Sequence, residues 1–74
     1  MGDSKEFRIP ANKGDVIALM YRIGEVLETD MDGEDMIFKV RVNKDDYVKQ
    51  AYLLVDYDQS VAKVEQDENE GESN

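Results

Sequence analysis

The stretch that decides the fold runs from Phe7 to Val42 and reads FRIPANKGDVIALMYRIGEVLETDMDGEDMIFKVRV. Its first residues alternate polar and apolar side chains up to Pro10, as a half-buried strand does before a residue without an N–H group interrupts its ladder. Its last residues, from Phe38 onward, alternate in the same way. Between them lie a helical pattern and a hairpin signal. The stretch therefore predicts a unit of strand, helix, strand and strand.

A helix is predicted from Asp15 to Ile23. Its apolar residues recur at positions i, i+3, i+4 and i+7, which places them on one face. These residues are Val16, Leu19, Met20 and Ile23. We expect Asp15 to cap the start of the helix through its side-chain oxygen. We expect Gly24 to take the left-handed conformation that often follows the end of a helix.

A hairpin is predicted at Asp32-Gly33, because both residues tolerate the positive φ angles of a two-residue turn. The predicted closing pair of this turn is Met31 and Glu34. That register places four residues of the hairpin on one face, in the pairs Leu27:Phe38 and Thr29:Met36. It also sets Asp30 against Asp35, a like-charge pair that destabilises a hairpin and that a longer loop would relieve.

A second helix is predicted after Asn43, which can cap it with Asp46 three residues later. Its predicted apolar stripe consists of Tyr47, Val48, Ala51, Tyr52, Leu54 and Val55. The helix is expected to fray near Tyr57. The whole order is β-α-β-β-α, which predicts a small α+β domain, half of a ferredoxin-like fold. We expect a three-stranded antiparallel sheet in the spatial order 1-3-2, with both helices on one face.

Length and charge define the predicted domain organisation. A chain of 74 residues holds one small domain. We assign residues 1–4 to a disordered or added N-terminus, residues 5–57 to the α+β domain, and residues 58–74 to a disordered acidic tail. Residues 57–74 contain six acidic residues and one basic residue, and such a composition usually only solvates a chain.

The composition excludes several functions. The chain has no cysteine and no histidine, so disulfides, thiolate nucleophiles and serine or cysteine triads with histidine are absent. It has no glycine-rich phosphate loop, so we expect no nucleotide binding by this chain. Its net charge of −9 argues against a broad nucleic-acid surface and against DNA as a partner. We therefore expect no enzyme activity and no bound cofactor.

A calcium site is the weaker interpretation of the acidic hairpin. The residues Glu28-x-Asp30-x-Asp32-Gly33 match the first half of an EF-hand loop. The position that needs a bidentate glutamate is Lys39, and the flanking residues predict strands where an EF-hand has helices. We expect a solvated hairpin tip and no metal site.

Three basic residues are the candidate contact residues. Lys39 and Arg41 alternate with apolar residues of the last strand, so they project from the sheet face opposite the helices. Lys44 follows at the start of the second helix. A basic open sheet face is a candidate surface for RNA or a protein partner, although no aromatic residue lies on it to stack with bases. The alternative is that these residues are ordinary solvent-facing side chains.

These residues together carry a resemblance. Ile9-Pro10, Gly14-Asp15, the apolar helix, the run from Gly24 to Glu28 and the alternating basic strand resemble the C-terminal domain of the HflX family of ribosome-associated GTPases. The resemblance covers about residues 7–43. It implies a monomeric C-terminal piece that contacts the large ribosomal subunit, through protein or RNA, or regulates an upstream GTPase domain. GTP and Mg²⁺ are implied only for that missing domain, and none of their ligands can be transferred to this chain.

A second functional hypothesis is a stand-alone acidic adaptor or inhibitor that works through residues 58–74. Neither hypothesis involves a membrane. The longest apolar run, Val16 to Tyr21, is far shorter than the roughly 20 residues that span a bilayer. The N-terminus lacks the features of a signal peptide, so we expect a cytoplasmic protein.

Overall fold

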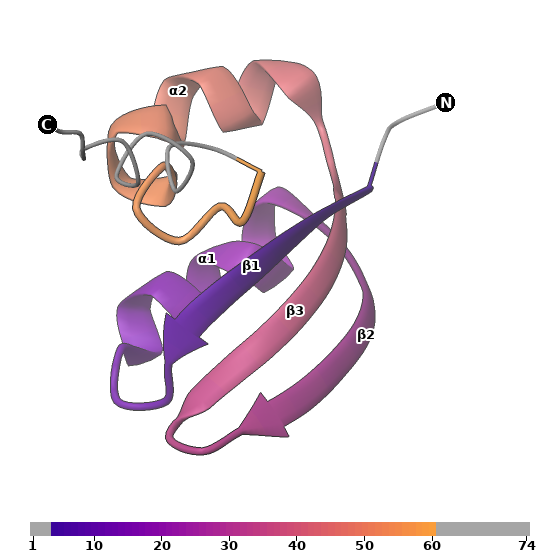
Figure 1. Ribbon diagram of the computed structural model, residues 1–74. Coiled ribbons are helices and arrows are strands. Elements are labelled where there is room, and N and C mark those ends of the chain that lie inside the picture. The colour runs from indigo at the N-terminus through magenta and orange to yellow at the C-terminus, as the bar shows by residue number, and fades with distance from the viewer. Residues whose placement is uncertain (1–3, 61–74) are drawn as a thin grey trace, which may run out of the picture.

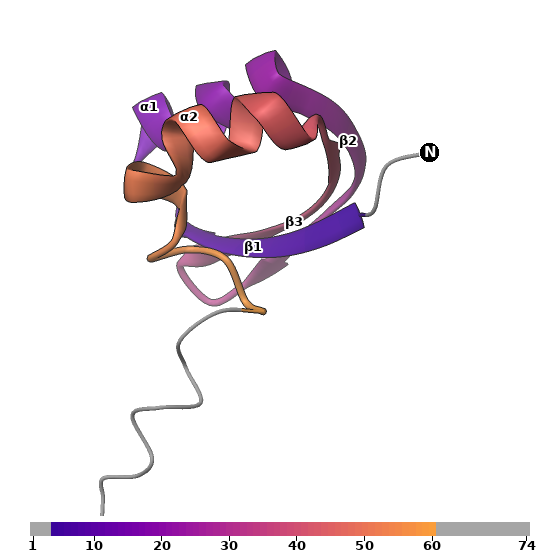
Figure 2. The same ribbon diagram turned by 90° about the horizontal axis from the view of Figure 1, so that it is seen from above.

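The elements follow one another in the order β-α-β-β-α in the computed structural model, which describes residues 4–60. They are β1 (Ser4–Pro10), α1 (Gly14–Ile23), β2 (Gly24–Asp32), β3 (Asp35–Val42) and α2 (Lys44–Leu54). Both helices lie on the same face of the sheet, and no helix or strand of residues 4–60 covers the other face, which we call the open face (Figure 2). The predicted α+β fold is confirmed.

β3 is the central strand of an antiparallel sheet with the order β1-β3-β2 (Figure 1). Its Phe38 lies between Phe7 of β1 and Thr29 of β2. β1 begins at Ser4, which pairs with Arg41, so the predicted disordered N-terminus extends one residue too far. β1 and β2 are the two edge strands of the sheet.

The apolar face of α1 and its end at Ile23 are confirmed, but its start and the conformation of Gly24 differ from the prediction. The helix begins at Gly14, and Lys13 occupies the N-cap position without a side-chain hydrogen bond. Asp15 lies in the first turn, where its Oδ1 accepts a hydrogen bond from the amide of Val16 at 2.9 Å. Its negative charge there still favours the helix, because the N-terminal amides carry a partial positive charge.

Gly24 does not take the predicted left-handed conformation. Its φ of −156° is extended, and β2 begins at this residue. A Cβ atom at Gly24 would lie 2.7 Å from the carbonyl oxygen of Arg41 and 2.7 Å from Cγ1 of Val40. Glycine is therefore needed for close approach between β2 and β3, because no side chain fits between their backbones.

The predicted register of the hairpin is wrong. The closing pair is Asp32:Asp35, and Gly33, with a φ of 65°, is the first of two turn residues. Thr29 rather than Leu27 therefore lies opposite Phe38. The register then shifts at a bulge between Val26 and Glu28, so Leu27 is unpaired and 37% exposed. An extra residue of this kind changes which side chain faces the core.

The core lies between the sheet and the helices. Its buried members are Phe7, Ile9, Val16, Leu19, Met20, Ile23, Phe38, Val40, Val42 and Leu54. Only part of the predicted α2 stripe packs against it. Val48 is 67% exposed and Tyr52 is 75% exposed, because α2 presents its Tyr47 and Leu54 side to the core. The predicted cap of α2 is confirmed, since Asn43 Oδ1 accepts the amide of Asp46 at 3.1 Å.

The chain after α2 returns to the outer edge of β1 (Figure 1). The amide of Arg8 donates to the carbonyl of Tyr57 at 2.9 Å, and the amide of Gln59 donates to the carbonyl of Glu6 at 2.9 Å. The predicted tail therefore starts too early, because residues 58–60 belong to the folded domain. The rest of that predicted tail, residues 61–74, lies outside the described residues.

Candidate interaction surface

The open face of the sheet carries charged side chains from all three strands. They alternate with the buried residues of each strand and share cross-strand rows. We define the open face by its charged members: Glu6, Arg8, Glu25, Glu28, Asp30, Asp32, Asp35, Lys39 and Arg41. Acidic residues outnumber basic residues on it. The sheet therefore presents a negative surface rather than the basic surface that β3 alone suggested.

Two of the predicted contact residues lie on the open face beside acidic neighbours. Lys39 pairs with Glu6 on one side and with Glu28 on the other. Nη1 of Arg41 donates to Oε1 of Glu25 at 3.0 Å. Opposite charges directly across a sheet attract each other, so the positive charge of both residues is partly offset within the domain.

Lys44, the third predicted contact residue, does not join the other two on the open face. It is the first residue of α2 and belongs to the helical layer, where it is exposed. A single flat partner on the open face therefore meets Lys39 and Arg41 but not Lys44.

Arg8 is the basic residue of the open face that the sequence analysis missed. Its guanidinium donates to Asp35 at 2.8 Å and also to Asp32. These hydrogen bonds, first that with Asp32, raise the pKa of Arg8 above its ordinary value. Arg8 thereby relieves the repulsion of the Asp32:Asp35 closing pair. The alternation around Phe7 places Arg8 on this face, but no sequence signal points to its partners.

The acidic hairpin does not form a metal site in the described part of the chain. Among residues 4–60, no group of three or more acidic side chains is gathered where it could hold a metal ion. Two of the carboxylates in the EF-hand-like stretch or next to it, Asp32 and Asp35, bind Arg8 instead. Asp30 pairs with Ile37 across the hairpin rather than with the predicted Asp35.

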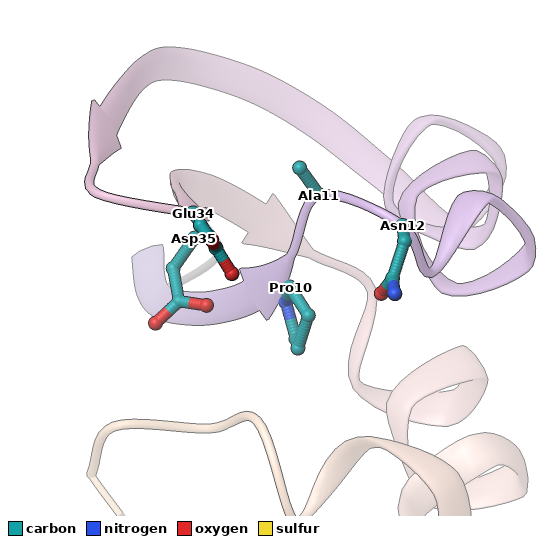
Figure 3. Close-up of a pocket in the computed structure, with 5 residues that line it drawn as sticks. All are labelled: Pro10, Ala11, Asn12, Glu34 and Asp35. Carbon is teal, nitrogen blue, oxygen red and sulfur yellow. The ribbon is translucent and has the colours of Figure 1, made fainter.

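A hollow lies where the loop after β1 meets the hairpin turn. It is lined by Pro10, Ala11, Asn12, Glu34 and Asp35. Figure 3 shows Asp35 at one end of it and Asn12 at the other. The amide of Ala11 donates to the carbonyl of Glu34 at 2.9 Å and joins its two walls. Of the two carboxylates that line the hollow, Asp35 is bound by Arg8 at 2.8 Å.

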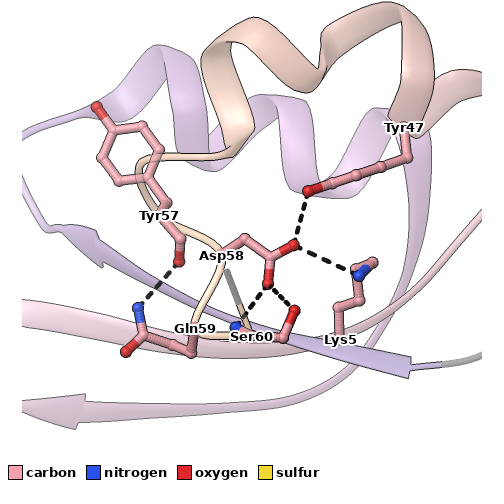
Figure 4. Close-up of polar contacts among 6 residues, drawn as sticks. All are labelled: Lys5, Tyr47, Tyr57, Asp58, Gln59 and Ser60. Atoms are coloured by element: carbon pink, nitrogen blue, oxygen red, sulfur yellow. Dashed lines mark hydrogen bonds and ion pairs between the residues drawn. The ribbon is translucent and has the colours of Figure 1, made fainter. Parts of the chain in front are cut away.

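A buried polar cluster around Asp58 holds residues 57–60 against β1 (Figure 4). Asp58 is 0% exposed. Its Oδ2 accepts the hydroxyl of Tyr47 at 2.6 Å and lies 3.4 Å from Nζ of Lys5, while its Oδ1 accepts the amide and hydroxyl of Ser60. Lys5 also lies 5.0 Å from the centre of the Tyr47 ring. Asp58 is therefore satisfied on both oxygens, as a buried carboxylate must be.

The cluster keeps Asp58 charged and Tyr47 protonated. Burial raises the pKa of Asp58, but hydrogen bonds from Ser60 and Tyr47 and the charge of Lys5 outweigh burial and lower the pKa below its ordinary value. Burial, helped by the bond to Asp58, raises the pKa of Tyr47 to about 12. The hydrogen bonds and the Lys5 charge that cause these shifts also hold residues 57–60 in place, so the cluster is a structural anchor. The sequence signal for it was an aspartate followed by a serine two residues later, which is typical of a local turn.

Comparisons with protein-family models, curated proteins and solved structures found no match to this chain. None of the helices within residues 4–60 has the length and apolar character to cross a membrane.

Proposed function

We propose that this chain is a non-catalytic contact domain, related to the C-terminal domain of HflX-like GTP-binding proteins. In that role it contacts the large ribosomal subunit or regulates an upstream GTPase domain that binds GTP and Mg²⁺. The resemblance over residues 7–43 supports this proposal. The positions that carry the resemblance include Gly14 at the start of α1 and Gly24 where β2 and β3 approach closely.

The observation that carries the proposal is the open face. Both helices cover the opposite side of the sheet (Figure 2). A folded surface of mixed charge with an acidic excess suits a basic protein partner, because complementary charges steer association and fix orientation. It suits RNA less well, because binding to phosphates requires an excess of lysine and arginine. The protein version of the contact is therefore the better supported one.

Binding of the chain to purified large ribosomal subunits, measured by co-sedimentation at increasing salt, tests the proposal. We expect weak binding that salt weakens further, with no response of the chain to GTP. An absence of binding both to the subunits and to their isolated proteins would exclude the direct contact.

Charge variants separate a protein partner from RNA. With a basic protein partner, Glu6→Gln and Glu28→Gln weaken binding, whereas Lys39→Gln does not. With RNA, Lys39→Gln weakens binding and the two glutamate variants strengthen it. Asp45→Asn in the first turn of α2 is the matched control, because Asp45 is exposed on the helical layer.

The acidic adaptor is the second candidate function, and the composition of residues 61–74 favours it. Truncation after Ser60 tests it without removing the bonds to Asp58. Loss of partner binding on truncation would favour the adaptor. Unchanged binding would favour the folded contact domain.

A further inference from the structure

The two edges of the sheet differ in what pairs with them. Residues 57–59 cover the outer edge of β1 with backbone hydrogen bonds. In the described part of the chain, β2 pairs with β3 alone. The outer side of β2 therefore presents backbone groups that another extended segment can pair with. The amide of Met31 donates to Oδ1 of Asp30 at 2.8 Å, so an added strand that pairs with this amide replaces that local hydrogen bond.

Two different rows of side chains flank the outer edge of β2. Glu28, Asp30 and Asp32 lie in the row on the open face. The row on the helical side contains Thr29 and Met31, and Met31 is 54% exposed. An added strand beside β2 would thus meet carboxylates on one face and uncharged side chains on the other.

α1 extends the apolar side of this edge. It packs over β2 and β3. The ring of its Tyr21 stands edge-on to the ring of Phe38, with 6.0 Å between the ring centres. Tyr21 is nevertheless 58% exposed. Phe38 is the cross-strand neighbour of Thr29. An apolar side chain from an added strand would therefore find an aromatic ring as well as Met31 on the helical side.

The same edge disfavours pairing between two copies of the chain. The bulge at Leu27 limits the regular stretch of β2 to residues 28–32. In an antiparallel pair of two such stretches, acidic side chains of one copy would lie beside acidic side chains of the other, and like charges at this position repel. The occupant that fits is a segment of opposite charge.

We propose that residues 28–32 of β2 bind an extended segment of a basic partner, in which basic and apolar residues alternate, as a fourth strand of the sheet. This is strand addition, in which main-chain hydrogen bonds give affinity and alternate side chains give specificity. The basic residues meet Glu28 and Asp30, because Asp32 is already bound by Arg8, and the apolar residues meet Met31 and Tyr21. The proposal rests on the contact role proposed above and names its surface and its partner.

An NMR titration of the full chain with an acetylated, amidated peptide of alternating lysine and valine tests the pairing. We expect chemical-shift changes at residues 28–32 and at Tyr21, slower hydrogen exchange of β2 amides, and little change at the amides of β1, whose outer edge is covered. A peptide of the same composition with its lysines grouped at one end should bind at least about tenfold more weakly, because it cannot match both rows.

Alternate N-methylation of the peptide separates strand addition from simple charge attraction. One methylated register blocks the edge that faces β2 and should abolish binding, whereas the other blocks the edge that faces solvent and should be tolerated. Equal binding of both methylated peptides would overturn the proposal. So would shift changes centred on Lys39 and Arg41 of the central strand.

Variants of the protein give an independent test. Asp30→Lys should lower the affinity for the alternating peptide about tenfold or more, because an attractive pair becomes a like-charge pair. Asp45→Lys on α2 is the control and should have little effect. If Asp30→Lys abolishes peptide binding but leaves the binding to large subunits unchanged, the β2 edge is not the ribosomal contact and the contact role stands alone. Unaltered peptide binding by Asp30→Lys would overturn the proposal for β2.

Discussion

β1 and β2 are edge strands of the same three-stranded sheet, but within residues 4–60 only the outer side of β1 forms backbone hydrogen bonds with another segment. The edge of β1 is covered by residues 57–59, which the buried Asp58 anchors. Within residues 4–60 nothing pairs with the outer edge of β2, which is flanked by Glu28, Asp30 and Asp32. An exposed strand edge can pair with strands of other molecules. Proteins limit this pairing either by covering the edge with another segment or by placing charged side chains along it. Within residues 4–60 the domain thus has one covered edge and one edge lined with charge.

The largest expected effect comes from removing the anchor of the covered edge. Asp58→Ala should lower the free energy of unfolding by about 2 to 4 kcal/mol, because Tyr47 and Lys5 lose a buried partner. Urea unfolding measures this loss. Hydrogen exchange should also become faster at the amides of Arg8 and Gln59, so that the β1 edge behaves like the β2 edge.

Asp45→Ala is the control for that substitution, because Asp45 is an exposed acid in the first turn of α2. It should cost less than about 1 kcal/mol. An equal loss in the two variants would mean that the Asp58 cluster does not anchor residues 57–60.

The next effect concerns the start of the open edge. Gly24→Ala should lower the free energy of unfolding by about 1 to 3 kcal/mol, because its Cβ would lie 2.7 Å from both Arg41 and Val40. Gly14→Ala is the matched control, since nothing lies within 4 Å of its Cβ position. It should be neutral or stabilising by up to about 1 kcal/mol. Similar thermal unfolding of the two variants would show that the two strands separate without cost at Gly24.

A smaller effect is expected where β1 is linked to the hairpin tip. Arg8→Gln should destabilise the chain less than Gly24→Ala does, because Arg8 is partly exposed and its ion pairs are screened by solvent. The loss comes from the unrelieved Asp32:Asp35 pair. It should shrink at high salt, and Asp32→Asn should restore part of it in a double variant. Urea midpoints at two salt concentrations measure both effects.

The smallest effect is a spectroscopic signature of the covered edge at high pH. The folded pKa of Tyr47, about 12, lies above its ordinary value of 10.0. Its contribution to stability is therefore complete below pH 10 and is lost as the pH rises through about 12. In an absorbance titration, part of the tyrosine signal should appear only near that upper value. Tyr47→Phe should remove this late part, and an unchanged titration would contradict the assignment.

The periodic parts of the fold could be predicted from the sequence. The buried face of α1 and the alternation in β1 and β3 follow from the spacing of apolar residues, and the order of the elements follows from the signals between them. The hairpin was predicted at Gly33 because its turn requires a positive φ. These features depend on residues that are close together in the chain.

The candidate surface could be predicted only in part. The alternation of apolar and basic residues in β3 predicts that Lys39 and Arg41 lie on the open face, and the strand pairing agrees. The alternation could not show that Glu6, Glu25 and Glu28 stand beside them, because these neighbours come from other strands. The sign of the surface is set by cross-strand pairing, which is a property of the sheet rather than of one strand.

Three features follow from the amino-acid sequence alone: the β-α-β-β-α order, the composition of the core face of α1 and the lack of cysteine and histidine chemistry. Three others depend on how the folded elements meet: the hairpin register, the close approach at Gly24 and the return of residues 57–60 to β1. The two groups of features differ in how far apart along the chain the interacting residues lie. Local spacing fixes the period of an element, whereas edge pairing, bulges and buried ion pairs depend on residues that meet only after the chain has folded.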